Sequence, residues 1–364
     1  MSTFEIIKQT AITQIKSFLV VKNNKRSWHI PLLAALCVGI PLFIGLYFNH
    51  LSLGLSASIG GLVILYYQPA ISFGSRMLTL LVCSFGFSLS LAIGLGFSFN
   101  PYISAVVLGF FAMGINWVTT FFKTKPPGNF FFIMIASMAS CQPFHLELIP
   151  EKIGFIFLGT MLACFLALCH GLLTLKKQQS AEVLAIHIKK GQFVSLIDSV
   201  VTGVFISISL IIGHFFEMQN PYWIPISCLA ILQGISRNHV WERMVHRIVG
   251  TFIGIGLCWI ILQISDTPLT ICFSIFVLLY IAETLIIKNY ALAVIFITPM
   301  TILLAEVGTS FTSNTEIIVP ARFLDITIGS VLGAIGGWII YNQRFKNSAV
   351  KQLRKTRIVI RKKL

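Results

Sequence analysis

Apolar runs of about 17–24 residues recur along the whole chain and are separated by short polar gaps. A helix of that length crosses the hydrocarbon core of a bilayer, which is about 30 Å thick. The pattern predicts an all-α membrane protein with about twelve transmembrane helices. Six are expected near residues 30–48, 51–67, 76–98, 102–122, 129–147 and 152–175, and six more near 196–215, 222–236, 247–264, 268–287, 289–306 and 319–341. Spans two and eight are short, and spans five and eleven abut their neighbours, so the pattern defines these four least sharply.

The charged residues are sorted between alternate gaps. If the N-terminus is cytoplasmic, Lys152 and Arg322 are the basic residues left on the outer side. The inner side then carries Lys8, Lys16, Lys22, Lys25, Arg26, Arg76, Lys123, Lys125, Lys176, Lys177, Lys189, Lys190, Arg237, Arg243, Arg247, Lys288 and the basic end of the chain. Cytoplasmic loops carry such an excess of Lys and Arg. The pattern therefore predicts an even number of spans with both termini in the cytoplasm.

Composition agrees with a bilayer as the main solvent. Hydrophobic residues make up 56% of the 364 residues and charged residues 11%, with a mean hydropathy of +0.87. In a soluble chain, a net charge of +15 would suggest a nucleic-acid partner. Here the Lys and Arg residues flank the predicted membrane spans instead. Eight cysteines, mostly inside apolar runs, form no CxxC or Cys/His ligand spacing, and no GxxxxGK[ST], HExxH or GxSxG motif occurs. We expect neither an enzyme, nor a cofactor, nor a metal, nor a nucleic-acid partner.

An internal similarity predicts a duplication. The segment IPEKIGFIFLGTMLAC begins at Ile149 and VPARFLDITIGSVLGA begins at Val319, and both place a Gly nine residues after a Pro. Arg76 and Arg247 open the third and ninth spans. A repeated unit of six spans keeps its orientation, so the halves would be related by an axis along the membrane normal, with a pathway between them. The alternative is that any two apolar helices look alike.

The expected organisation follows from that repeat. It comprises a cytoplasmic amphipathic segment at 1–29, a first six-helix repeat at 30–175, a basic cytoplasmic linker at 176–195, a second repeat at 196–341 and a basic cytoplasmic tail at 342–364. The apolar stripe and basic residues of the first segment are typical of a helix in the membrane interface.

The second half carries the most specific sequence. It reads YWIPISCLAILQGISRNHVWERMVHRIVGTFIGIG from Tyr222 and PARFLDITIGSVLG from Pro320. This text resembles the fusaric acid resistance protein-like (FUSC) family and its aromatic acid exporter relatives. The matching positions are Trp223, Ser227, Arg247, Gly250, Thr251, Gly254, Arg322, Asp325, Gly329 and Gly333. Ser227 stands where Thr is common, and Gln233-Gly234 replaces a usual Gln-Pro.

The resemblance implies a transporter in the bacterial inner (cytoplasmic) membrane that exports aromatic or other hydrophobic organic acids, coupled to protons. Plant aluminium-activated malate transporters share a related six-span unit, which keeps a channel-like organic-anion uniporter open. A membrane scaffold without transport is the third alternative. The relatives also leave open a homodimer and, for some of them, a periplasmic adaptor as partners.

Charged residues at membrane depth are costly and usually functional. Arg322 and Asp325 lie three residues apart, hence on one helix face. They either neutralise each other, or Arg322 attracts the anion and Asp325 switches with a proton. Glu283 is the second candidate for proton coupling, with an ion pair to Lys288 as the structural alternative.

The remaining candidates line the predicted pathway or pack its helices. Arg247 and Arg76 would gather organic anions at the inner ends of the two halves, or else extend to lipid phosphates. Trp223 and Ser227 would contact substrate, although Trp223 also suits an interfacial aromatic belt. Small-xxx-small patterns predict close helix packing at Gly250, Thr251, Gly254, Gly329 and Gly333.

Overall fold

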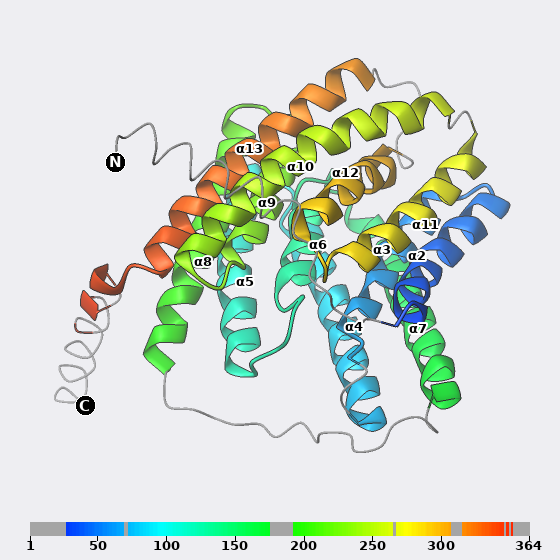
Figure 1. Cartoon of the computed structure of the whole chain (residues 1–364), viewed down its shortest axis with the longest axis horizontal. Coiled ribbons are helices and arrows are strands. Elements are labelled where there is room, and N and C mark those ends of the chain that lie inside the picture. The colour runs from blue at the N-terminus through cyan, green and yellow to red at the C-terminus, as the bar shows by residue number, and fades with distance from the viewer. Residues whose placement is uncertain are drawn as a thin grey trace. The chain divides into compact units, whose positions relative to one another are not determined.

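The computed structural model is helical in the part of the chain that it describes (Figure 1). That part comprises residues 27–68, 72–174, 192–264, 267–306, 315–345, 347–348 and 351. The predicted amphipathic segment at 1–29 and the tail at 342–364 lie largely outside the described residues, as does the linker at 176–195.

Eight of the described helices are long and apolar enough to cross a membrane. They are α2 (His29–Tyr47), α4 (Phe73–Gly96), α5 (Pro101–Phe121), α7 (Ile149–Thr174), α8 (Gln192–Phe215), α10 (Arg237–Ile264), α11 (Pro268–Leu285) and α13 (Thr315–Ile340). The protein is therefore a multi-pass membrane protein. Helix α10 begins at Arg237 rather than at residue 247, because its first two turns are polar and escape a search for apolar runs. The hydroxyl of Ser236 caps it by accepting from His239 N at 3.2 Å.

Four shorter apolar helices lie between the long ones. They are α3 (Leu51–Gly61), which a 3₁₀ turn continues over Leu62–Tyr66, α6 (Phe130–Ser140), α9 (Trp223–Leu232) and α12 (Tyr290–Glu306). A helix of ten residues rises about 15 Å, roughly half of the hydrocarbon core. Of the twelve expected crossings, eight are therefore helices of full length in the described chain. The four short helices are spans two, five, eight and eleven, which the apolar pattern defined least sharply.

The breaks at the short helices have local causes. Pro221 precedes α9 and Gly234 follows its C-cap, while Pro143 lies just beyond α6. Proline lacks the backbone donor that a continuing helix needs, and glycine favours a helix end. The predicted span 129–147 ran through Pro143 and the predicted span 222–236 ran through Gly234, because apolar content alone does not register these two residues.

The chain divides into two compact units that are interleaved along the sequence. Unit 1 comprises Met1–Leu65, Phe155–His170 and Glu242–Val319, and unit 2 comprises Tyr66–Gly154, Gly171–Trp241 and Pro320–Leu364. Each unit therefore takes helices from both halves of the sequence.

Unit 1 is built around α2, which packs against α3 and α11, while α11 packs against α12. Glycines allow two further close approaches. A Cβ at Gly60 of α3 would meet the backbone of α7 at Ile156, and a Cβ at Gly254 of α10 would lie 2.7 Å from the carbonyl oxygen of Ile295 in α12. Backbones that come this close exclude any larger side chain.

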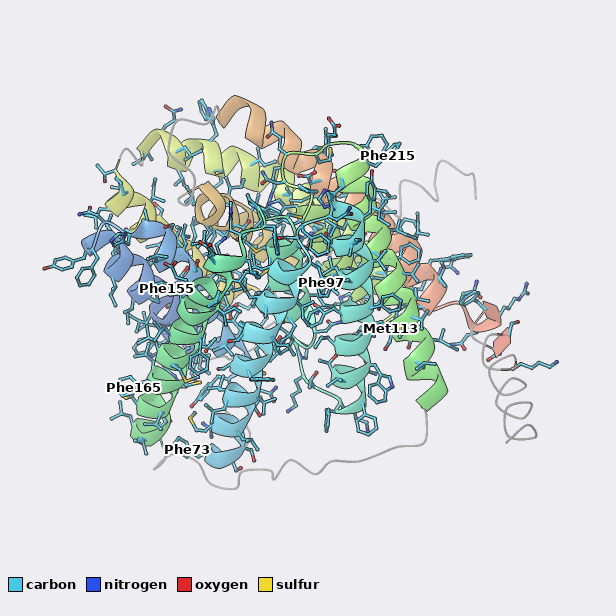
Figure 2. The ribbon with its side chains drawn as sticks, turned by 180° about the vertical axis from the view of Figure 1, so that it is seen from behind. Phe73, Phe97, Met113, Phe155, Phe165 and Phe215 are labelled. Atoms are coloured by element: carbon cyan, nitrogen blue, oxygen red, sulfur yellow. The ribbon has the colours of Figure 1, made fainter. Side chains whose placement is uncertain are left out.

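Unit 2 is built around α8, which packs against α5 and α9. Helix α6 packs against α4, α5 and α9. Helices α5 and α8 run side by side, with Met113 labelled on α5 (Figure 2). A Cβ at Gly203 of α8 would lie 2.9 Å from the Cβ of Met113. The buried core of this unit includes Leu108, Ile133 and Leu229.

The packing scheme of unit 1 recurs in unit 2. Three helix pairs recur: α2 with α3, α2 with α11 and α11 with α12 in unit 1 correspond to α8 with α9, α8 with α5 and α5 with α6 in unit 2. The contact of α3 with α7 likewise has a counterpart in that of α9 with α13. In each unit, the first, second and sixth helices of one sequence half pack with the third, fourth and fifth of the other.

Candidate functional site

Helices α9 and α13 form the framework of the principal candidate site, in unit 2. All ten residues of α9 are buried. A Cβ at Gly329 of α13 would meet the carbonyl oxygen of Ile224 and lie 2.8 Å from the Cβ of Ser227, and a Cβ at Gly333 would lie 2.8 Å from that of Ile231. The two helices thus touch through backbone atoms, which holds the side chains at the start of α9 firmly against α13.

A guanidinium group lies on an indole at this contact. The Cζ atom of Arg322, on α13, lies 3.0 Å from the ring centroid of Trp223, at the start of α9. Arg322 and Trp223 are each 5% exposed. A cation over an indole face is worth about 2 kcal/mol when the pair is desolvated.

Two polar side chains lie close along the same helices. Asp325 follows Arg322 by one turn of α13 and is 1% exposed, and Ser227 follows Trp223 by one turn of α9 and is fully buried. The Oδ1 atom of Asp325 accepts no hydrogen bond from the described residues. A buried carboxylate oxygen without a donor is expensive, so the fold tolerates an unfavourable group here.

A chain of amides joins the other end of α9 to α6. Gln233 Nε2 donates to Pro127 O at 3.0 Å and to Asn129 Oδ1 at 3.2 Å. Asn129 Nδ2 donates in turn to Asn116 Oδ1 at 2.8 Å, and Asn116 Nδ2 donates to Ser199 Oγ at 3.1 Å. These bonds tie the start of α6 to the end of α9. We did not single out Asn116 and Asn129 from the sequence, although carboxamides beside apolar runs were a visible signal.

The opposite ends of α6 and α9 are also joined. Ser137 Oγ donates to Tyr222 O at 3.2 Å. The two short helices therefore run antiparallel, with side-chain hydrogen bonds at both ends. Tyr222, the residue before Trp223, is therefore held in place by a hydrogen bond from α6.

A cationic cluster faces the start of α12 in unit 1. Arg247 Nη1 donates to Tyr290 Oη at 3.4 Å, and Arg243 Cζ lies 4.3 Å from the centroid of the same ring. Arg247 is 8% exposed. Asn289 caps α12 by accepting from the backbone N–H groups of Ala291 and Leu292. Arg243 and Tyr290 were missed as site residues, although the four-residue spacing of Arg243 and Arg247 places them on one helix face.

Arg76 is held inside unit 2. It is 2% exposed, and its Nη1 donates to Tyr67 Oη at 2.9 Å. A guanidinium buried in this way does not extend to lipid phosphates, so the alternative of an interfacial Arg76 is wrong. Arg76 and Arg247 share one arrangement, since each donates to a tyrosine hydroxyl.

The other predicted residues occupy defined places. Glu283 is half-buried on α11 of unit 1, whereas Asp325 belongs to unit 2. Gly250, Thr251 and Gly254 lie on the α10 face toward α12: a Cβ at Gly250 would lie 3.0 Å from the carbonyl oxygen of Ala291, and Thr251 is 1% exposed. Among the described side chains, no three of His, Cys, Asp and Glu gather as metal ligands.

Comparison with known proteins bears on the second half of the chain. The family model described as "Fusaric acid resistance protein-like" matches residues 206–336. This stretch is similar to that family. The match confirms the resemblance drawn from Trp223, Ser227, Arg247, Arg322 and Asp325, all of which it includes.

Two curated bacterial proteins are similar to part of the chain. "Uncharacterized membrane protein YvaC" of Bacillus subtilis (strain 168) is 32% identical over 138 residues, which are 38% of this chain and 22% of that protein. "Uncharacterized protein slr1298" of Synechocystis sp. (strain ATCC 27184 / PCC 6803 / Kazusa) is 25% identical over 147 residues, which are 39% of this chain and 19% of that protein. The chain thus spans about a fifth of the length of these relatives. No solved structure matches it.

Proposed function

We propose that this protein exports aromatic or other hydrophobic organic acids across the bacterial inner membrane, in exchange for protons. The observation that carries the proposal is the buried guanidinium of Arg322 on the indole of Trp223, one helix turn from the buried Asp325. The similarity of residues 206–336 to the fusaric acid resistance protein-like family supports the same function.

The chemistry of that group suits an aromatic acid. A guanidinium that stacks through its face directs its N–H groups outward in its own plane, where a carboxylate binds with two parallel hydrogen bonds. An indole offers an aromatic substrate a face or an edge for ring contact. Arg322 would then bind the carboxylate, with Trp223 and Ser227 setting its orientation.

Asp325 is the proposed proton carrier. A charged residue at membrane depth is costly, and such carboxylates are typical of proton relays in transporters. In an exchange mechanism the site carries the proton and the anion in turn. Asp325 would take up a proton on the outer side after the anion has left Arg322, and would release that proton on the inner side before the next anion binds. Glu283 of α11 is the second proposed coupling residue.

Two further arginine groups would attract the anion along the substrate path. They are Arg247 with Arg243 and Tyr290, and Arg76 with Tyr67.

We also propose that the chain arose by duplication of a six-helix unit and that the halves exchanged helices. The recurrence of the packing scheme of unit 1 in unit 2 supports this. Short helices at corresponding positions of two repeats are typical of transporter binding sites. Both termini are proposed to be cytoplasmic on the charge pattern.

The test is flux of fusaric acid and of benzoate in proteoliposomes of the full chain, with and without an imposed pH gradient. We expect gradient-driven flux in the wild type. Arg322→Gln should abolish it and Arg322→Lys should retain part, because lysine keeps the charge but loses the planar fork. Asp325→Asn should leave anion exchange intact and remove the response to the gradient. Lys125→Gln is an exposed control in the same unit and should behave as the wild type.

Each outcome bears on a different part of the proposal. Gradient-driven flux in Asp325→Asn would refute the coupling residue. Flux that ignores the gradient in the wild type would favour the uniporter. Absence of flux of either acid in correctly folded protein would overturn the exporter.

A further inference from the structure

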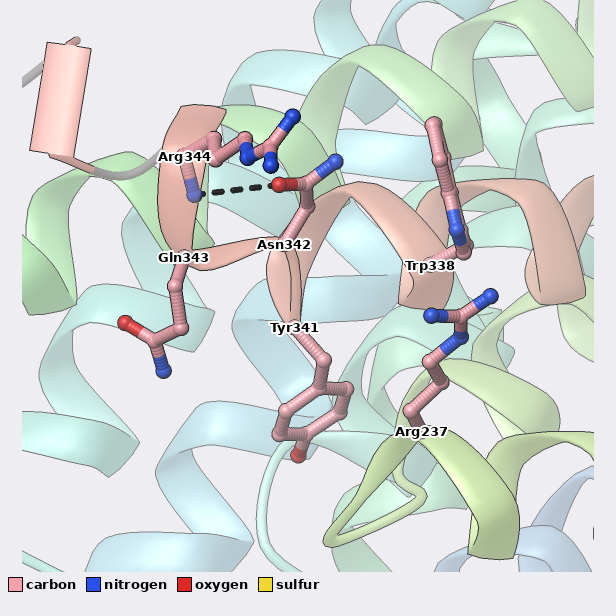
Figure 3. Close-up of a pocket in the computed structure, with 6 residues that line it drawn as sticks. All are labelled: Arg237, Trp338, Tyr341, Asn342, Gln343 and Arg344. Carbon is pink, nitrogen blue, oxygen red and sulfur yellow. Dashed lines mark hydrogen bonds between the residues drawn. The ribbon is translucent and has the colours of Figure 1, made fainter.

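A pocket of about 370 Å³ lies beyond the last turn of α13, in unit 2. Six residues line it: Arg237, Trp338, Tyr341, Asn342, Gln343 and Arg344 (Figure 3). It contains two guanidinium groups, and among its lining residues there is no carboxylate. The proposed transport path uses none of these six residues.

The fold builds this pocket from two segments that are far apart in sequence. Tyr341 Oη donates to Gly234 O at 2.6 Å, which ties the turn before α10 to the end of α13. A Cβ at Gly337 would lie 2.8 Å from Val240 Cγ1, so the first turn of α10 packs against the last turn of α13. These contacts bring Arg237, at the start of α10, to the pocket.

A local turn places the second arginine. Asn342 Oδ1 accepts from Arg344 N at 3.1 Å and from Phe345 N at 3.4 Å, as the dashed line in Figure 3 shows for Arg344. The chain thereby bends back directly after the helix. Burial and, beyond it, the Asp198 carboxylate raise the pKa of Tyr341, so its phenol remains protonated and keeps its hydrogen bond to Gly234.

The position and the charge of the pocket fit a phosphate group. The first turn of α10 contributes the positive end of a 28-residue helix, which favours an anion there. Two arginines add guanidinium forks that match phosphate oxygens. The apolar span of α13 ends at Ile340, so the pocket lies where headgroups meet a transmembrane helix.

An exposed apolar stripe leads from the pocket along α13. Val331, Ile335 and Trp338 are 44%, 47% and 42% exposed, and their spacing of four and three residues places them on one face. An indole at the end of a span is typical of the membrane interface. A ligand that joins a phosphate to a hydrocarbon chain would match both the pocket and the stripe.

We propose that this pocket binds the phosphate of an anionic phospholipid, whose acyl chain lies along Val331 and Ile335. Arg237 and Arg344 contact the phosphate. Trp338 borders the glycerol region, and Tyr341 is a positioning residue that holds Arg237 in place through Gly234. The proposal does not depend on transport, and the test below measures no flux.

Native mass spectrometry of the detergent-solubilised full chain tests the proposal. The protein is titrated with dioleoylphosphatidylglycerol, with dioleoylphosphatidylcholine and with inorganic phosphate. We expect the anionic lipid to bind most tightly, and inorganic phosphate not to displace it at equal concentration. Each arginine near an anionic lipid surface contributes enough for about a fivefold change in affinity, so Arg237→Gln with Arg344→Gln should weaken binding of the anionic lipid roughly thirtyfold.

Two further variants locate the effect. Lys123→Gln with Lys125→Gln removes the same charge from exposed positions in the same unit and should leave the affinity unchanged. Trp338→Ala should weaken lipid binding. If the double arginine variant does not fold, Arg344→Gln alone replaces it, since Arg344 lies beyond α13 and its backbone N–H makes the bond to Asn342.

The outcomes separate the sources of the phosphate. Equal binding of both lipids, or an equal loss in the lysine control, would overturn the proposal. Inorganic phosphate that binds as tightly as the anionic lipid, with no effect of Trp338→Ala, would assign the pocket to a soluble phosphate and would also overturn it.

Discussion

Gly329 offers the sharpest test of how α9 and α13 hold the candidate site. An added methyl group at this position would meet the carbonyl oxygen of Ile224 and lie 2.8 Å from the Cβ of Ser227. Ordinary van der Waals contact begins at 3.4 Å, so Gly329→Ala must widen this contact by at least about 0.6 Å. The obstructing atoms belong to backbone and to a buried Cβ, and no flexible side chain can move aside.

The cost follows from overpacking. Forcing a methyl group into a well-packed contact costs about 1–3 kcal/mol. At about 2–4 °C per kcal/mol, the melting temperature of the solubilised protein should fall by roughly 2–12 °C. Because Trp223 and Ser227 both lie on α9, the same shift should separate them from Arg322 and lower transport beyond the loss of stability.

Gly256→Ala provides the matched control. Gly256 lies on a membrane-spanning helix, α10, and an added Cβ there meets nothing within 4 Å. Alanine is the better helix former by about 1 kcal/mol, so this variant should melt at or slightly above the wild-type temperature. A Gly329→Ala protein that melts no lower than Gly256→Ala would refute the close approach of α9 and α13.

Two other predictions concern hydrogen bonds outside that contact. Gln233→Leu removes two bonds and leaves the buried Asn129 amide oxygen without its donor, so the free energy of unfolding should fall by about 1–3 kcal/mol in chemical denaturation; an unchanged value would refute the amide chain. Tyr290→Phe removes the acceptor of Arg247 but keeps the ring under Arg243, so the protein should lose no more than about 1.5 kcal/mol of stability while the KM for anion flux rises. An unchanged KM would remove this cluster from the substrate path.

The short helices show both the reach and the limit of sequence reasoning. Apolar periodicity located every one of them, because hydrophobic content does not depend on tertiary context. Their ends were misplaced at α6 and α9, where the apolar composition continues past the residues at which the helix stops. Pro143 beyond α6 and Gly234 beyond α9 were visible signals of those ends, and more weight on them would have shortened both spans.

The candidate site was found in part. Arg322 stood out because a basic residue on the outer side breaks the charge pattern. Its partner could not be deduced, since Trp223 lies about a hundred residues earlier and only the packing of α9 on α13 brings the two together. The partner of Arg76 could not be deduced for the same reason: Tyr67 directly follows the 3₁₀ turn Leu62–Tyr66 and lies outside α4, so helical spacing predicts no contact between them.

The sequence alone determined the solvent of this protein, its helical class and its family likeness over the second half. Those properties follow from the length of apolar runs, the placement of charges and local motifs. Each of these signals can be read from one segment at a time, without knowledge of its neighbours in space. The tertiary structure decided which helices share a unit and which arginine meets which aromatic ring. It brought α2 and α3 together with α11 and α12, and α8 and α9 together with α5 and α6. Such pairings depend on the fit of whole helix surfaces, at glycines above all, and no single segment of sequence contains that information.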